Sequence, residues 1–211
     1  MKKALIFFGG WDGHNPTGFA ELFESMLTEN GYEVESYDNL DCLNDAEKLL
    51  TYDVIIPFWT MGQIEKEQFN NLSIAIQSGV GLAGVHGGMG DAFRGNVSFQ
   101  WMVGGQFLGH PHVGPYKVDI IDMNHPIVRN IESFDYDSEQ YYMQVDPSIE
   151  ILAETQYNHE GKTVTMPVVW TKNWGNGKVF YSALGHDIKE YIEQFPVAAE
   201  IALRGFIWAT R

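Results

Sequence analysis

Histidines dominate the residues that could do chemistry in this chain of 211 residues, which has seven of them and a single cysteine. Three of them, His14, His86 and His186, each lie just past a predicted strand, in short loops that contain glycine. The imidazole group changes its protonation near neutral pH and also binds transition metals. The sequence therefore predicts proton transfer or metal binding, with zinc as one suitable ion for His14, His86 and His186.

The stretch Gly81–Gly88 reads GLAGVHGG. An apolar strand, one reactive residue and then glycines is the pattern of a nucleophile elbow, which holds its central side chain above the sheet. The central residue here is His86, which suits acid–base or metal chemistry rather than an acyl-enzyme. We expect Gly87 and Gly88 to line a substrate site beside it. The alternative is a plain glycine turn in which His86 only caps the strand.

A second glycine pair, Gly9-Gly10, leads into Trp11 and His14. The carboxyl ends of parallel strands meet at one edge of a sheet, where ligands bind. We therefore expect this loop and the His86 loop to form two walls of one site. Trp11 would stack on a sugar ring there, although core packing is the usual role of a tryptophan.

Glu139 stands out among the acidic residues because aromatic side chains, Tyr141 among them, follow it closely. Such neighbours would exclude water and raise the pKa of the carboxyl group. Glu139 joins His86 and His186 as a candidate catalytic residue. Tyr141 and His110, which follows a further glycine pair, are candidate substrate-binding residues, and so is His14.

Strands alternate with helices up to residue 86, which predicts an α/β fold built from parallel βαβ units. The expected strands are 4–8, 33–37, 53–58 and 80–85, and the helices are one capped by Thr17, one over 45–50 and one over 65–79. Later strands at 116–121, 149–153, 164–170 and 178–182 predict a smaller β-rich extension, followed by a buried helix over 195–208. No linker interrupts the pattern, so residues 1–211 are expected to form one domain.

The charge of the chain narrows the class of ligand. The 28 acidic and 13 basic residues give a formal charge of −15, which would repel nucleic acid and anionic membranes. A neutral small molecule is the expected partner. The single cysteine, Cys42, allows no internal disulfide, and no apolar run is long enough to span a bilayer. We expect a cytoplasmic protein, and exposed aromatic residues make a homo-oligomer plausible.

Several short motifs, taken in order, resemble the ThuA-like family, which is named for trehalose utilisation. The motifs are Gly10-Trp11 with His14, 84–87, 104–107 with His110-Pro111, His125-Pro126-Ile127, Glu139 with Tyr141, 167–170, and 177–186. The resemblance implies a three-layer sandwich of the flavodoxin-like, class I glutamine amidotransferase-like type. It does not imply amidotransferase activity, because His86 replaces the nucleophilic cysteine. Family members generally carry Asp-Glu where this chain has Ser138-Glu139, so one carboxylate is missing.

The family resemblance implies a role with trehalose or related disaccharides, including 3-keto sugars. Three functions remain open. The first is an isomerase or lyase, in which His86 or Glu139 removes a proton next to a carbonyl and a second histidine or a metal holds the enolate oxygen. The second is a metal-assisted hydrolase, and the third is a sugar-binding protein without catalysis.

Overall fold

Nine strands form one mixed sheet in the computed structural model, which describes residues 1–211. Their order across the sheet is β2-β1-β3-β4-β9-β8-β7-β5-β6. The strands are β1 (Lys2–Gly10), β2 (Tyr32–Tyr37), β3 (Val54–Thr60), β4 (Gly81–Val85), β5 (Gly105–Ile120), β6 (Phe134–Val145), β7 (Glu150–His159), β8 (Lys162–Trp174) and β9 (Gly177–Ser182). The helices are η1 (Asp12–His14), α1 (Pro16–Glu29), η2 (Asp41–Leu43), α2 (Ala46–Leu49), α3 (Lys66–Gln77), α4 (His86–Gly90), α5 (Val97–Val103), η3 (Glu190–Gln194) and α6 (Pro196–Ala209).

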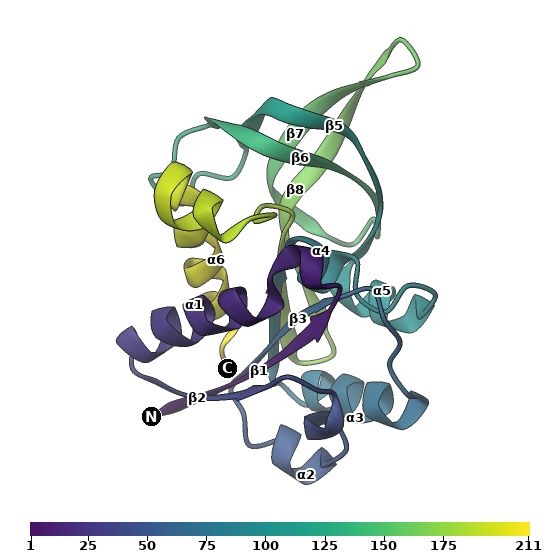
Figure 1. Cartoon of the computed structure of the whole chain (residues 1–211), viewed down its shortest axis with the longest axis vertical. Coiled ribbons are helices and arrows are strands. Elements are labelled where there is room, and N and C mark those ends of the chain that lie inside the picture. The colour runs from purple at the N-terminus through teal and green to yellow at the C-terminus, as the bar shows by residue number, and fades with distance from the viewer.

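Strands β2, β1, β3, β4 and β9 are parallel to one another, as the βαβ pattern predicts. Helices α1 and α6 cover one face of this part of the sheet, and α2, α3 and α5 lie on the other (Figure 1). Four phenylalanine rings pack between α1, β3 and α6: Phe19, Phe23, Phe58 and Phe206. Burying these rings against apolar strands contributes to the stability of this half.

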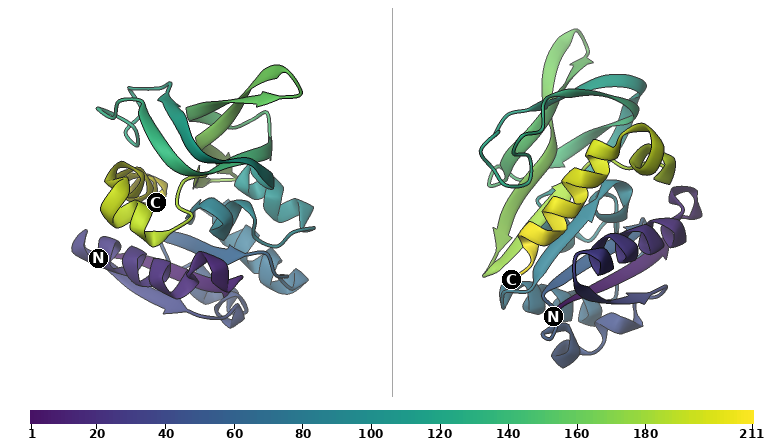
Figure 2. Two further views of the ribbon diagram at one scale, coloured as in Figure 1. Left: turned by 45° about the horizontal axis from the view of Figure 1, so that its top comes forward. Right: turned by 90° about the vertical axis from the view of Figure 1, so that its left-hand side faces the viewer.

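The prediction of a mostly parallel sheet with a small extension is wrong, because the antiparallel part is larger than predicted and belongs to the same sheet. The neighbours from β9 through β8, β7 and β5 to β6 are all antiparallel, and they continue the same sheet. This half rises away from the helical layers and curls over one edge of the parallel strands (Figure 2). The first part of β5 was missed because Pro111 and Gly109 interrupt its alternation, and the strand shifts register on both sides of Gly109.

One helix boundary and two whole elements also differ from the prediction. Helix α1 is capped by Asn15, whose side chain accepts a hydrogen bond from the backbone of Gly18 at 3.2 Å, and not by Thr17. Pro16 then occupies the first turn, where its missing N–H costs nothing. Strand β6 and helix α5 were not predicted, whereas α6 lies where the sequence placed it. No helix is both long and apolar enough to cross a membrane.

The topology creates one distinctive edge. Strands β1, β3, β4 and β9 end side by side, and the β5–β6 pair lies above those ends (Figure 1). Loops that leave the four strand ends therefore face side chains of the antiparallel half, which is the position expected for a ligand site in an open α/β sheet.

Candidate functional site

Four side chains from distant parts of the chain meet at this edge. His14 ends η1 after β1, His86 opens α4 after β4, Glu139 lies on β6, and His186 follows β9. Each offers one ligand atom, and these atoms all lie within 4.8 Å of one another. We call these four residues the His₃Glu cluster. The loops after β1 and β4 meet, as the sequence predicted, and the ring centroids of His14 and His86 are 4.9 Å apart.

His86 has the backbone of an elbow residue. Its φ of 45° lies in the left-handed region, which a residue with a Cβ adopts only under strain. The Nδ1 atom donates a hydrogen bond to the carbonyl of Ala183 at 2.8 Å, so Nε2 carries the free lone pair. This Nε2 is buried, has no hydrogen-bond partner and lies 3.4 Å from Oε2 of Glu139. The elbow thus presents an unused nitrogen to the cluster.

His14 is held by a side chain at the end of β3. Its Nδ1 lies 2.8 Å from the hydroxyl oxygen of Thr60, and both residues are buried. Burial, and then the nearby rings of His86 and His186, lower the pKa of His14 from 6.5 to about 3. The ring is therefore neutral at physiological pH, which is the form that binds a metal.

His186 completes the set from the loop after β9. Its Nδ1 lies 3.4 Å from Oε2 of Glu139, is buried and has no hydrogen-bond partner. The loop is fixed on its other side, because the backbone N–H of Gly185 donates to the hydroxyl of Tyr136 at 3.0 Å. The hydroxyl of Tyr191 in turn donates to the carbonyl of Leu184 at 3.0 Å.

The expectation that the pKa of Glu139 is raised is wrong. Burial does act to raise it, but the adjacent His86 and the charges of His186 and His110 outweigh burial and lower the pKa to about 2. The aromatic neighbours that motivated the expectation are present, since Tyr141 stacks on His86 with centroids 4.1 Å apart. Glu139 is therefore an ionised carboxylate in a ring of imidazoles.

The cluster has the chemistry of a metal site. Three imidazole nitrogens and a carboxylate oxygen suit zinc or another first-row ion. The two separations of 3.4 Å from Glu139 are longer than hydrogen bonds. They match the distance of about 3.3–3.4 Å between two ligands bound tetrahedrally at about 2.0–2.1 Å. Histidine ligands usually donate their second N–H to a carbonyl or other acceptor, as His86 does to Ala183.

A pocket of about 110 Å³ opens beside the cluster. Its lining consists of Trp11, His14, Met61, Asp91, Arg94, Phe107, His110, Glu139 and Tyr141. Arg94 is anchored by two hydrogen bonds to Asp91, at 2.6 and 2.7 Å, which leaves its guanidinium at the wall of the pocket. A small ligand can therefore approach the cluster from this side only between polar groups and aromatic rings.

Most predicted substrate-binding residues lie at this pocket. Trp11 packs edge-on against His14 and is 48% exposed, and Tyr141 and His110 line the wall, with Nε2 of His110 at 3.7 Å from Oε1 of Glu139. A Cβ at Gly87 would lie 2.5 Å from the His14 ring, so the cluster needs glycine there. Gly88 instead faces Phe58 of β3 and serves the packing of α4.

The residues that support the cluster were not predicted from the sequence. Thr60 is a polar residue at the end of a buried strand, and that position was a usable signal. The carbonyl of Ala183 had no such signal, because any residue type supplies it. Cys42 lies outside the pocket, and burial raises the pKa of its thiol to about 12, so it is no nucleophile.

Ser138, the departure from the family pattern, points away from the cluster. Its hydroxyl donates to Oε1 of the buried Glu190 at 2.7 Å, and the hydroxyl of Tyr136 donates to Oε2 at 2.6 Å. A carboxylate at position 138 would face Glu190 and not His86. The missing acid therefore leaves the His₃Glu cluster intact.

Known structures share this fold along its whole length. A ThuA-like protein from Bacteroides uniformis is 21% identical, with a TM-score of 0.78, and the match covers 99% of this chain and 91% of that one. A ThuA-like protein from Parabacteroides merdae is 18% identical, with a TM-score of 0.76 and coverage of 99% and 89%. A cytoplasmic protein from Salmonella typhimurium LT2 is 14% identical, with a TM-score of 0.68 and full coverage of both chains.

Among curated proteins, none matches this chain. The model of the ThuA family, described as trehalose utilisation, matches residues 3–209. A match over nearly every residue, with ThuA-like proteins among the structural neighbours, confirms the resemblance seen in the motifs. This chain belongs to the ThuA family.

Proposed function

We propose that this protein is a metal-dependent enzyme that transfers a proton next to the carbonyl of a keto sugar derived from trehalose or a related disaccharide. The observation that carries the proposal is the His₃Glu cluster, in which two buried nitrogens, Nε2 of His86 and Nδ1 of His186, have no partner in the protein. Buried polar atoms without a partner are rare in native proteins, and a bound ion would satisfy both. The family description supplies the sugar class.

Each residue has a role in this proposal. His14, His86, His186 and Glu139 would hold the ion, which would supply a Lewis acid beside the carbonyl of the substrate. His110 is the remaining histidine at the pocket and moves the proton between carbon and water. Burial raises the pKa of Tyr141 well above 10, so its hydroxyl stays protonated and donates to the sugar.

The surroundings suit a neutral sugar. A hollow of about 500 Å³ adjoins the pocket and shares Phe107 and His110 with it. One sugar unit would reach the cluster between Trp11 and Tyr141, and the second would rest on Phe107 in the hollow. We place the protein in the cytoplasm, in line with the Salmonella protein of the same fold that is described as cytoplasmic.

Metal-assisted hydrolysis is the second candidate, and the same cluster favours it. A metal held by imidazoles and one carboxylate, and open to a pocket on one side, can also activate water. A sugar-binding protein without catalysis is the third. We also propose that the fold is of the flavodoxin-like, class I glutamine amidotransferase-like type. We further propose that the protein forms a homo-oligomer.

One experiment separates the candidates. The protein is loaded with Zn²⁺ or Mn²⁺, dialysed, assayed for metal content, and incubated in D₂O with a 3-keto disaccharide while proton NMR spectra are recorded. His86→Ala is the test variant. His112→Ala is the matched control, because that histidine is half-buried on β5, bonds the carbonyl of Pro115 and does not line the pocket.

We expect one metal ion per chain and exchange of the proton next to the carbonyl in the wild type and in His112→Ala. Both should be lost in His86→Ala. Hydrolysis without exchange, abolished by a chelator, would replace the proposal with the hydrolase. Binding of the sugar with neither reaction would favour the non-catalytic protein, and a wild type that retains no metal would refute the metal site.

A further inference from the structure

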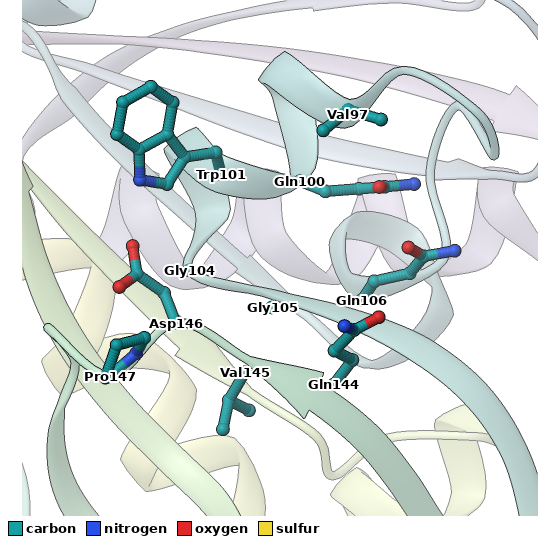
Figure 3. Close-up of a pocket in the computed structure, with 10 residues that line it drawn as sticks. All are labelled: Val97, Gln100, Trp101, Gly104, Gly105, Gln106, Gln144, Val145, Asp146 and Pro147. Atoms are coloured by element: carbon teal, nitrogen blue, oxygen red, sulfur yellow. The ribbon is translucent and has the colours of Figure 1, made fainter.

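We propose that a hollow between α5 and the β5–β6 pair is a second binding site, and that it takes a neutral sugar. It has a volume of about 420 Å³ and is lined by Val97, Gln100, Trp101, Gly104, Gly105, Gln106, Gln144, Val145, Asp146 and Pro147. None of these residues lines the pocket at the His₃Glu cluster. Figure 3 shows an indole ring at one end of the hollow and a group of glutamine side chains at the other.

The indole ring belongs to Trp101 on α5. It is 61% exposed, which is unusual for so large an apolar ring. Trp174 packs against it edge-on with centroids 5.2 Å apart, and Lys172 donates from Nζ to the carbonyl of Trp101 at 2.7 Å. The ring is thus held in place while one face stays open. The C–H face of a pyranose ring would bury apolar surface on it.

The end of the hollow opposite Trp101 is lined by the amide groups of glutamine side chains. Gln106 and Gln144 face each other across β5 and β6, and Gln100 projects toward them from α5 (Figure 3). The Nε2 atom of Gln100 is buried and has no hydrogen-bond partner. An amide group both donates and accepts hydrogen bonds, as a sugar hydroxyl does. A hydroxyl bound here would supply the partner that Gln100 lacks.

The charges at the hollow select a neutral ligand. Lys172 is the cation beside it, and its Nζ is already bound to the carbonyl of Trp101 and, at 2.8 Å, to Oδ2 of Asp146. No lysine, arginine or histidine lines the hollow itself. A phosphate or carboxylate would therefore meet no free positive charge, in a chain with a formal charge of −15. Hydroxyl groups can use the amides and the acceptor oxygens of Asp146 instead.

The floor of the hollow packs closely on the residues beneath it. A Cβ at Gly104 would lie 2.8 Å from Cδ of Lys172, and one at Gly105 would lie 2.8 Å from the ring of Trp170. The indole N–H of Trp170 donates to the carbonyl of Val103 at 3.0 Å, which fixes this turn. A rigid, preformed site loses little conformational entropy when a ligand binds.

The hollow and the pocket at the His₃Glu cluster share no lining residue, but one depression adjoins both. This depression, lined by residues 63–64 and 93–97, shares Val97 with the hollow. The same depression shares Arg94 with the cluster's pocket. The inference has only its ligand class, a neutral sugar, in common with the proposed function, and it requires neither a metal nor catalysis.

The test uses the full chain labelled with 5-fluorotryptophan and titrated with trehalose, followed by fluorine NMR. Trp101→Phe assigns the Trp101 signal, and Trp208→Phe on α6 is the matched control. We expect the Trp101 signal to shift with trehalose in a saturable way. Gln100→Leu should weaken this binding about tenfold, the effect of one hydrogen bond, while Trp208→Phe should leave it unchanged.

A second arm keeps the site distinct from the catalytic proposal. In His86→Ala the Trp101 titration should be unchanged, even if all sugar chemistry is lost. A Trp101 signal that stays fixed while the Trp11 signal shifts would place trehalose only at the cluster and overturn the inference. A shift of the Trp101 signal with adenosine but not with trehalose would also overturn the inference, because the site would then bind an aromatic base.

Discussion

Nε2 of His86 lies 3.4 Å from Oε2 of Glu139, although one residue follows β4 and the other lies within β6. The distance is too long for a good hydrogen bond and suits two ligands of one ion. The bond from Nδ1 of His86 to Ala183 fixes the tautomer that such a role requires. The cluster is therefore formed by the meeting of the parallel and antiparallel halves of the sheet.

Thr60→Val tests the support of His14. The substitution keeps the shape of a buried side chain but removes the hydroxyl that lies 2.8 Å from Nδ1. We expect zinc affinity to fall about 10–100-fold, as is usual when such a supporting partner is lost. Competition with a chromophoric chelator measures the affinity. Thr60→Ser should keep it near the wild-type value, and equal affinities for Val and wild type would contradict the role.

His110→Gln tests the proton-transfer residue. His110 lines the pocket but is not a member of the His₃Glu cluster. We expect the rate of proton exchange in the keto sugar to drop about 10²–10⁴-fold, the usual contribution of a general base. Metal content measured on the same sample should stay at one ion per chain. Loss of the metal in this variant would move His110 into the ligand set.

The pH dependence of stability follows from the buried His14. Its pKa is about 3 in the folded protein and 6.5 ordinarily, so the unfolded chain takes up the proton first as the pH falls. The stabilisation from neutral His14 is complete above pH 6.5 and declines below it, by at most about 1.4 kcal/mol per pH unit. Urea unfolding of metal-free protein between pH 7 and pH 5 measures this decline.

His14→Gln is the comparison for that series, because glutamine does not titrate. Its stability should change less steeply over the same range. Glu139 has a pKa of about 2 in the folded protein. Its contribution to the free energy of unfolding is therefore lost only below about pH 4.5, where the carboxyl group of the unfolded chain becomes protonated. Parallel slopes for the wild type and His14→Gln between pH 7 and pH 5 would show that His14 is not the sensitive group.

Ser138→Asp tests the finding that position 138 faces Glu190 rather than the cluster. The new carboxylate would face the buried Glu190 in place of a hydroxyl donor at 2.7 Å. We expect a loss of about 3 kcal/mol or more in the free energy of unfolding at pH 7.5, and a smaller loss at pH 5, where one carboxyl takes up a proton.

Ser138→Asn, which keeps a donor and adds no charge, should cost much less at both pH values. Urea unfolding gives these differences, and a metal titration accompanies it. Metal affinity that is stronger in Ser138→Asp would place the new acid in the His₃Glu cluster and contradict the geometry.

Local patterns in the sequence determined the parallel strands and the positions of the loop histidines. Continuous apolar runs such as 4–8 and 80–85 predicted the buried parallel strands, because a strand covered on both faces has no polar alternation. The elbow at His86 and the loop histidines 14 and 186 were predicted to meet, because parallel strands align their carboxyl ends. The family resemblance rested on motifs that the sequence states directly.

The tertiary structure decided the rest. Strand β6 had no clear periodicity, since both faces of it are partly buried, so only the fold showed that it brings Glu139 over the strand ends. The pKa of Glu139 depended on three histidines that lie far away in sequence. Electrostatic and ligand geometry are set by distances between side chains, and local sequence does not encode distances between strands that pair across the sheet.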